Sequence, residues 1–246
     1  MQELEIVGAP INGAMGFQPA ATSLAKGIFA LDAMLLIIIT AISVFVTALM
    51  IYTFIRYNRK RNPTPATFTH NSKIEVTWTI VPVFILIFIG ALTLPELFRQ
   101  QVIPEADVNI KVTGYSWYWG YEYTDHDFGF DSYMLEKDQL AEYGYDDEYY
   151  LLATDTAVVV PVNKTVVMMV TGGDVIHSWK IPAFGVMQDA VPGRLAQLWF
   201  KAEREGIYFG QCSELCGQNH AYMPITVKVV SEEDYNNWIE WAKNEY

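Results

Sequence analysis

Residues 28–55, IFALDAMLLIIITAISVFVTALMIYTFI, form the apolar segment that decides the fold, and Asp32 is their only charged residue. As a helix this segment would be about 42 Å long, which exceeds the roughly 30 Å hydrocarbon core of a membrane. Residues 76–98, VTWTIVPVFILIFIGALTLPELF, form a second segment of this kind. Membrane helices tolerate prolines such as Pro82 and Pro95 when neighbouring groups satisfy the freed carbonyls. The two segments predict a transmembrane helical hairpin; the alternative is a pair of buried core helices.

The composition also favours a membrane protein. Apolar residues make up 52% of the 246 residues and charged residues 18%, against about 25% charged residues in typical proteins. The net charge of −12 disfavours nonspecific binding to nucleic acid. Residues 1–100 hold seven basic and five acidic groups, whereas residues 101–246 hold nine basic and 23 acidic groups. The second part is long enough to bury its own core, so it does not need disulfide bonds for stability. Its two cysteines therefore need another explanation.

The loop at 56–75 predicts the sidedness of the hairpin. It begins RYNRKRNPTPATFTHNSK, with five basic residues and no acidic one. The positive-inside rule places such a loop in the cytoplasm and both chain ends on the other side. Residues 1–27 contain no apolar segment typical of a signal peptide, so either one has been removed or this extracytoplasmic tail is translocated with the first span. We therefore expect a tail, a hairpin over residues 28–99 and a periplasmic domain over residues 100–246.

The sequence after Glu105 predicts an all-β domain. Its short alternating or β-branched runs are separated by Gly, Pro, Asn and Asp, which is typical of an antiparallel sandwich or barrel. The expected strands are VNIKVT, YSWYWGYEY, YYLLA, AVVVPV, KTVVMMV, LAQLWF, GIYFGQ and ITVKVV. The acidic segment EYGYDDEYY is the expected long loop. The tail SEEDYNNWIEWAKNEY predicts a short helix with Ser231 as its N-cap and with Trp238 and Trp241 on one face.

One segment, QCSELCGQNHAYMP at 211–224, gathers potential metal ligands between two expected strands. It places Cys212, Cys216, His220 and Met223 at the spacing C-x3-C-x3-H-x2-M. Thiolate, imidazole and thioether donors together favour copper, since Met is a poor ligand for zinc and since magnesium and calcium prefer oxygen. The spacing therefore predicts a copper site on one loop.

The second cysteine favours two copper ions over one. A single-copper blue site uses one Cys, one downstream His, a weak axial Met and one distant upstream His, for which His177 in DVIHSWKIP is available. One cysteine is then surplus, and two thiolates on one loop could bridge a pair of ions. The pattern thus favours a dinuclear electron-transfer centre. The alternatives are a disulfide between Cys212 and Cys216, a zinc site, and a core position without a ligand role for His177.

Several motifs together resemble subunit II of the haem-copper cytochrome c oxidases, which carries the dinuclear copper A centre. They are IEVTWTIVPV, SWYWGYEY, FDSYM, DVIHSW, AVPGR and GQCSELCGQNHAYMP, and the resemblance extends from about Phe17 to the C-terminal helix. It implies a membrane-anchored all-β protein: a two-helix transmembrane hairpin, a cupredoxin-like Greek-key β-sandwich or barrel, and a short C-terminal helix. It also favours the bacterial cytoplasmic membrane, with both termini and the copper domain on the periplasmic side; the mitochondrial inner membrane is the alternative.

The resemblance also implies the metal ligands. The copper A ligands of the family correspond here to His177, Cys212, Cys216, His220, Met223 and the backbone carbonyl of Glu214. The Glu214 side chain corresponds to a carboxylate that reaches a magnesium or manganese ion shared with subunit I. The sequence alone leaves an ordinary solvated residue as the alternative for this side chain.

Further positions correspond to residues that the family uses to receive electrons. Trp117 matches the tryptophan through which an electron enters, although Tyr115 and Ser116 replace the usual His-Gln before it. If Trp117 and Trp119 share a strand, they point to one face, so at least one is expected in the core. The family docks cytochrome c through acidic positions that correspond to Glu122, Asp131, Asp155 and Asp174. Opposite charge would speed association with a basic donor, whereas the alternative is a merely solvated acidic face.

Glu75 corresponds to the family's glutamate at the entrance of a proton channel that continues through subunit I. The alternative is a carboxylate that the positive end of a helix dipole favours.

The expected function is electron transfer in a respiratory terminal oxidase, from cytochrome c through copper A to a haem of subunit I. Haem, oxygen reduction and most proton pumping would then belong to partner subunits. The expected partners are subunit I, further oxidase subunits, cytochrome c and membrane lipid, without nucleic acid. Two alternatives are a quinol-oxidase subunit II, which lacks the copper ligands, and a membrane-anchored copper-delivery protein, which would need an exposed and exchangeable site.

Overall fold

The structure, a computed structural model, describes residues 4–246, which form two compact units. One unit combines the N-terminal segment up to Gly27 with Phe98–Tyr246, and the other is Ile28–Leu97. The N-terminal segment therefore packs with the globular domain, to which it contributes a strand.

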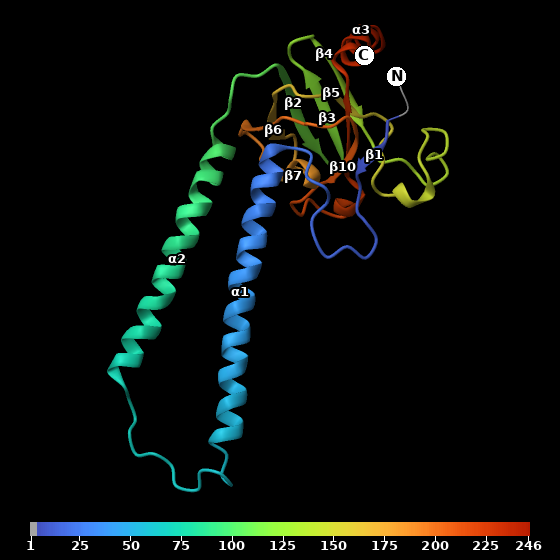
Figure 1. The fold of residues 1–246 in the computed structure, drawn as a ribbon. Helices are drawn as coiled ribbons and strands as arrows, with labels where there is room; N and C mark the ends of the chain where they lie inside the picture. Colours follow the sequence, from blue (N-terminus) through green and yellow to red (C-terminus); the bar gives the residue numbers. More distant parts are fainter. Residues whose placement is uncertain (1–3) are drawn as a thin grey trace. The chain divides into compact units, whose positions relative to one another are not determined.

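Two long helices carry the apolar segments, α1 (Ser23–Arg56) and α2 (Ser72–Gln101) (Figure 1). Both are long and apolar enough to cross a membrane, and none of their most apolar windows is buried within the protein. This exposure argues against the alternative of buried core helices. Pro82 and Pro95 lie inside α2 without ending it.

Each long helix begins earlier than expected because a polar side chain caps it. The Oγ1 atom of Thr22 accepts a hydrogen bond from the Ala25 amide at 3.0 Å, at the start of α1. The Oδ1 atom of Asn71 accepts from the amides of Lys73 and Ile74 at 3.2 and 3.3 Å, at the start of α2. These contacts satisfy amides that have no partner within the helix, so they fix its first turn.

The globular unit is a β-sandwich. One sheet has the strand order β4-β3-β2-β6-β9, the other has β1-β10-β11-β5, and β7 and β8 form a separate pair. The strands are β1 (Ile6–Gly8), β2 (Val108–Tyr115), β3 (Tyr118–Tyr123), β4 (Phe128–Ser132), β5 (Val158–Pro161), β6 (Val166–Gly172), β7 (His177–Ile181), β8 (Val186–Ala190), β9 (Ala196–Phe200), β10 (Gly206–Gln211) and β11 (Pro224–Val230).

Some strand predictions were wrong. Three pairings are parallel, β1 with β10, β5 with β11 and β2 with β6, so the sandwich is mixed and not purely antiparallel. The expected strand YYLLA lies instead at the end of a 3-10 helix, η1 (Asp147–Tyr149), and in the turn after it, where Leu151 has a φ of 73°. Strands β1, β4, β7 and β8 were not expected. The acidic segment 142–150 does lie in a long loop, as predicted.

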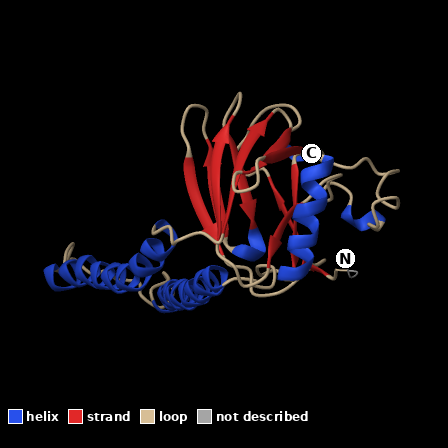
Figure 2. Ribbon diagram, turned by 90° about the horizontal axis from the view of Figure 1, so that it is seen from above, coloured by secondary structure: helices blue, strands red, loops and turns tan. Residues whose placement is uncertain are grey.

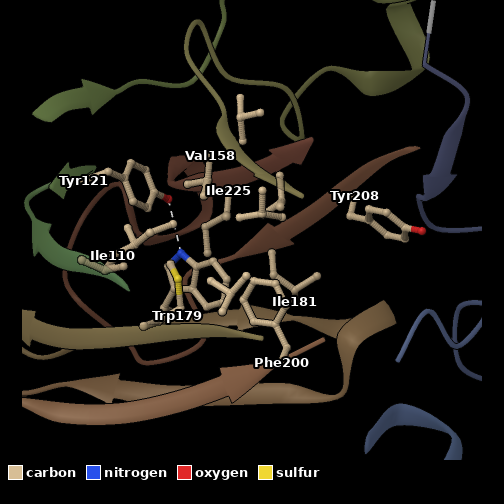
Figure 3. Packing of buried hydrophobic residues seen from close by; sticks show 14 of the residues in the cluster. Ile110, Tyr121, Val158, Trp179, Ile181, Phe200, Tyr208 and Ile225 are labelled. Atoms are coloured by element: carbon tan, nitrogen blue, oxygen red, sulfur yellow. Dashed lines mark hydrogen bonds between the residues drawn. The ribbon is translucent and has the colours of Figure 1, made fainter. Parts of the chain in front are cut away.

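The core lies between the sheets and is rich in aromatic residues (Figure 3). The Trp179 indole N–H donates to the Tyr121 hydroxyl at 3.3 Å, and both side chains are fully buried. Phe200 stacks on Phe184, with 4.7 Å between the ring centroids. Full burial of one such side chain contributes roughly 1.5–3 kcal/mol, so this core holds the strands that carry the site.

The C-terminal helix, α3 (Glu232–Glu245), packs on β5 and lies along the strands (Figure 2). Ser231 caps it as predicted, because its Oγ accepts the Asp234 amide at 3.1 Å. Trp238 is buried, whereas Trp241 is 51% exposed. The two tryptophans therefore have different surroundings, and only Trp238 belongs to the core.

Candidate metal centre

The candidate metal centre is built on the hairpin loop between β10 and β11. Gln211, the last residue of β10, pairs with Pro224, the first residue of β11. The intervening loop is closed at its base, since the Cys212 amide donates to the Met223 carbonyl at 3.1 Å. The pairing of two strands thus fixes the ends of the segment in which the sequence gathers its soft donors.

A second hydrogen bond attaches this loop to β7. The Ser213 amide donates to the Ser178 carbonyl at 3.0 Å, which brings Cys212 next to His177, the first residue of β7. The His177 Nδ1 atom lies 4.0 Å from the Cys212 sulfur. A residue 35 positions upstream is therefore placed at the loop, as the sequence predicted.

The donor atoms converge. The two cysteine sulfurs are 3.8 Å apart, and the Cys216 sulfur is 3.5 Å from the His220 Nδ1 atom. The ligand atoms of His177, Cys212 and Cys216 all lie within 4.8 Å of one another, and all three residues are buried. Two sulfurs and an imidazole at this spacing suit a soft or borderline metal ion.

The remaining predicted ligands occupy the same loop. The Glu214 carbonyl oxygen lies 3.4 Å from the Cys212 sulfur, while the Glu214 side chain is exposed. Met223 is 1% exposed and belongs to the same apolar cluster as both cysteines. His220 lies in a 3-10 turn, η3 (His220–Tyr222), and is partly exposed. The apolar core therefore covers one face of the site, and the loop between β10 and β11 covers the opposite face.

The two cysteines are free thiols in this structure, which counts against the disulfide alternative. Burial favours a neutral Cys212, but hydrogen bonding to His177 and to the backbone of Ser178 and Glu214 outweighs it and lowers the pKa of Cys212. Burial and the adjacent Cys212 charge raise the pKa of Cys216. Two buried anions this close repel each other, so the pair keeps a proton that a bound cation would displace.

Asp174 connects this site to the turn that carries Trp117. Its Oδ1 atom lies 2.9 Å from His177 Nε2, and its Oδ2 atom accepts the Ser116 amide at 2.8 Å. Burial favours the neutral carboxyl, but the hydrogen bonds from Ser116 and His177 hold the pKa of Asp174 well below its usual range. A carboxylate behind a ligating histidine orients the imidazole, which leaves its other nitrogen for a metal. Asp174 thus has a positioning contact that the sequence did not indicate.

Trp117 lies against the metal-binding loop. Its indole N–H donates to the Cys216 carbonyl at 3.2 Å, and its ring is partly buried. A Cβ atom on Gly217 would come within 3.2 Å of that ring, and the φ of +119° at Gly217 also favours glycine. Trp117 lies in the turn between β2 and β3, so it does not share a strand with Trp119. Trp119 is fully buried, which confirms that one of the two is core.

The four acidic positions differ in their surroundings. Glu122 and Asp131 are exposed on the neighbouring strands β3 and β4, and Glu122 forms a 2.7 Å ion pair with Lys111. Asp155 is partly buried, and its Oδ1 atom accepts the amides of Tyr133 and Thr156 at 2.8 and 2.6 Å. Glu122 and Asp131 therefore remain the acidic groups most available to a partner.

A row of stacked tyrosines lies beside these carboxylates. The ring centroids of Tyr115 and Tyr118 are 5.0 Å apart, and those of Tyr118 and Tyr133 are 4.6 Å apart. The pairing of β2 with β3 and of β3 with β4 brings the rings together. The spacing of these tyrosines along the chain therefore did not predict that they stack. Tyr115 also lies against Gly173, the residue before Asp174, because a Cβ atom on Gly173 would meet the Tyr115 ring.

Glu75 lies in the first turn of α2, in the helical unit. Its Oε1 atom accepts the Asn71 amide at 3.2 Å, and the residue is partly exposed. This contact is the helix-end arrangement that the sequence left as the alternative. A capping carboxylate can still exchange protons with water, so the contact is compatible with either role.

The fold is a mixed β-sandwich joined to two membrane-length helices, and its buried metal-binding cluster combines two cysteines of a hairpin loop with the first residue of β7. These features define a membrane-anchored protein of the cupredoxin type. The model of the family "Cytochrome C oxidase subunit II, periplasmic domain" matches residues 108–230, and that of its transmembrane domain matches residues 10–95. The chain belongs to the cytochrome c oxidase subunit II family.

Curated relatives and a solved structure agree with this assignment. The cytochrome c oxidase subunit 2 of Cereibacter sphaeroides is 62% identical, over 98% of this chain and 84% of the relative. The probable subunit 2 of Rickettsia bellii is 45% identical, over 94% of this chain and 84% of the relative. The crystal structure of the periplasmic domain of subunit II from Bradyrhizobium japonicum is 48% identical and has a TM-score of 0.53; it covers 59% of this chain and 99% of that domain.

A second solved structure is a mixed disulfide between a thioredoxin-like protein and a subunit II of cytochrome c oxidase, 47% identical to this chain over 59% of it and 96% of that chain, with a TM-score of 0.50. The family and the His/Cys/Cys cluster confirm the expected fold and the electron-accepting role in an oxidoreductase with partner subunits. They disfavour both the quinol-oxidase and the copper-delivery alternatives. The family implies a copper A centre, and the protein is membrane-anchored.

Proposed function

We propose that the loop between β10 and β11, together with His177, holds the dinuclear copper A centre and accepts electrons from cytochrome c. The observation that carries the proposal is the buried convergence of His177, Cys212 and Cys216, whose ligand atoms lie within 4.8 Å of one another. When bound, the copper pair supplies reversible one-electron chemistry between cytochrome c and a haem of subunit I. The residues that would hold it are His177, Cys212, Cys216, His220, Met223 and the Glu214 carbonyl.

The chain's own residues prepare the site for that role. The cysteines are 4% and 6% exposed and Met223 is 1% exposed, so little water reaches the donor atoms. The Cys212–Met223 and Ser213–Ser178 hydrogen bonds restrict loop movement, which lowers the rearrangement that a change of charge would require. Asp174 holds the His177 ring at Nε2 and leaves Nδ1 toward the sulfurs. Burial and restraint both support electron transfer and oppose metal exchange.

Trp117 is the proposed electron acceptor at the surface. Its ring is partly exposed, and its N–H contacts the carbonyl of Cys216 at 3.2 Å. The contact supports a short route from a docked donor to the metal-binding loop. We further propose that Glu122 and Asp131 guide the donor, with Asp155 and Asp174 adding to the local negative field.

The finer partner and membrane assignments are part of the same proposal. The exposed Glu214 carboxylate would reach a magnesium or manganese ion shared with subunit I, and its carbonyl would ligate copper. The loop at 56–75 would be cytoplasmic, and the copper domain would face the periplasm of a bacterial cell. The thioredoxin-like partner of the second solved relative supports reduction of Cys212 and Cys216 before copper binds.

Copper analysis of the full-length chain tests the proposal. We expect two copper ions per chain and one unpaired electron shared by both nuclei, because two sulfurs lie 3.8 Å apart beside two histidines. The full chain is the better sample, since a fragment starting near Pro104 would lack β1, which pairs with β10. Metal analysis and electron spin resonance measure both quantities. A single copper ion, or an electron localised on one nucleus, would contradict the proposal.

Replacement of Glu75 tests the proposed proton-channel entrance in the assembled oxidase. We expect Glu75→Ala to lower steady-state oxygen consumption severalfold and to slow haem reduction at the oxygen site, because a carboxylate that collects protons is lost. The copper spectrum and cytochrome c binding should not change. Glu75→Gln is the matched variant, since its amide oxygen can still accept the Asn71 amide at the start of α2. Normal turnover in Glu75→Gln with loss only in Glu75→Ala would assign Glu75 to helix capping alone.

A further inference from the structure

A cavity separate from the metal centre opens where α3 meets β5 and β11. Its volume is about 420 Å³, within the range of about 300–1,000 Å³ typical of small-molecule sites. The residues that matter below are Lys228 of β11, Asp155 before β5, and Asp234, Trp241 and Tyr246 of the C-terminal segment. None of them is a proposed copper ligand, and only Asp155 has a proposed part in guiding the electron donor, so the electron-transfer role does not explain the cavity as a whole.

Lys228 places a positive charge in the cavity without a partner. Its strand neighbours in register are Val159 of β5 and Ile207 of β10, which are both buried and apolar. Within residues 4–246 no hydrogen bond or ion pair reaches its ammonium group, and burial lowers its pKa. By contrast, Lys164 and Lys243 each pair with a glutamate, at 3.1 and 3.2 Å. A partly buried ammonium group gains most from an anion supplied by a ligand.

Two carboxylates disfavour a simple anion as that ligand. Asp155 and Asp234 line the same cavity, and neither is within ion-pair distance of Lys228. Their positions are fixed by hydrogen bonds from the Thr156 amide at 2.6 Å and from the Ser231 hydroxyl at 3.2 Å. With two negative charges and one positive charge around it, the cavity is matched by a ligand that carries a cation as well as an anion.

Two aromatic rings line the part of the cavity that suits the cationic group of such a ligand. Trp241 and Tyr246 are 51% and 44% exposed, and their ring planes meet at 85° with 5.8 Å between centroids. Asp155 lines the same cavity as the two rings. Burial raises the pKa of Tyr246, and the charges of Glu245 and Asp155 add to the shift. An indole and a phenol beside a carboxylate attract an alkylammonium group through cation–π and Coulomb interactions.

We propose that this cavity binds a small zwitterion of the phosphocholine type, in which an alkylammonium group and an anionic group are a few bonds apart. The ammonium group lies against Trp241 and Tyr246 beside Asp155, and the anionic group pairs with Lys228. Such a group occurs free in solution and as the headgroup of a lipid, and its recognition chemistry is the same in both.

Calorimetric titration of the full-length chain in a maltoside detergent tests the site, with phosphocholine as the probe. We expect saturable one-site binding, and at least about tenfold weaker binding of choline alone and of inorganic phosphate alone. Lys228→Met and Trp241→Ala should each weaken phosphocholine binding by about tenfold or more, because each removes one half of the recognition. Lys243→Met is the matched control: it removes a lysine from α3 that already pairs with Glu240, and it should not change binding.

The titration results either support or overturn the proposed zwitterion site. No saturable phosphocholine binding, equal binding of phosphate alone, or unchanged binding in Lys228→Met would each overturn the proposal. Competition by nanodiscs of diacyl phosphatidylcholine, but not by phosphatidylglycerol, would support the site with a lipid headgroup as the source. Competition by neither would support it with a soluble zwitterion as the source. The copper spectrum of Lys228→Met serves as the folding check, and it keeps a failure here distinct from a failure of the copper proposal.

Discussion

Cys216→Ser is expected to abolish the shared-electron copper signal and to reduce the copper content of the full chain from two ions to one at most. The Cys216 sulfur is 3.8 Å from the Cys212 sulfur and 3.5 Å from the His220 Nδ1 atom, so it connects the His220 side of the site to Cys212. A serine hydroxyl stays protonated at neutral pH and is a poor donor for a soft ion. Without the second sulfur, the remaining donors suit a mononuclear site.

Metal analysis and electron spin resonance of the copper-loaded chain check this expectation. Ser213→Ala is the matched control, since Ser213 lies in the same loop and, within the described residues 4–246, its hydroxyl bonds only to the Gln211 carbonyl at 3.2 Å. The Ser213 amide, which attaches the loop to β7, is retained in that variant. If Cys216→Ser still bound two ions with an electron shared between them, Cys216 would not be a bridging ligand.

The parts of the structure that were predicted correctly depend on local patterns. The apolar segments in α1 and α2 are long enough to identify membrane helices whatever they contact. Ser231 and the acidic residues after it identify the start of α3, because helix capping acts over only a few residues. The soft donors of the metal-binding loop are close in sequence, and one β-hairpin turn keeps them close in space.

The parts that were missed depend on distant contacts. Strand β1 has three residues and exists through its parallel pairing with β10, about 200 residues later. YYLLA has strand-forming residues, yet Tyr149, Tyr150 and Leu152 pack against a separate apolar cluster built around Phe209, which keeps the segment as turns. In this segment, tertiary packing outweighs the strand propensity of the individual residues.

The site also contains contacts that spacing could not reveal. The sequence indicated Asp174 only as a docking carboxylate, but the fold directs it to His177 and to the Ser116 amide at once. Neither contact follows from a periodic pattern, since the first depends on the bend before β7 and the second on the turn between β2 and β3. Lys228 has no role in the sequence pattern beyond its place in the expected strand ITVKVV, and the packing of α3 makes it part of a cavity lining.

Trp117→Leu is expected to slow electron transfer from cytochrome c by about a hundredfold at saturating donor, equivalent to roughly 2.7 kcal/mol of activation free energy. The reason is loss of the ring that joins the surface to the metal-binding loop through the Cys216 carbonyl. Copper content and the copper spectrum should not change, and rapid-mixing kinetics with the assembled oxidase measure the rate. Trp117→Phe keeps a ring but loses the N–H, so its electron-transfer rate should lie between the rate of the unmodified chain and that of Trp117→Leu.

The contrasting variant for that experiment is Glu122→Gln, which removes an exposed charge on β3 and leaves the loop intact. Because Glu122 acts through the electrostatic field, its loss should raise the apparent KM for cytochrome c and flatten the salt dependence, with the saturated rate unchanged. Asp174 is unsuitable for this comparison, since its carboxylate also holds His177 and its loss would alter the metal site. If Trp117→Leu behaved like Glu122→Gln, changing KM and sparing the saturated rate, Trp117 would be a docking residue and electrons would reach the loop by another route.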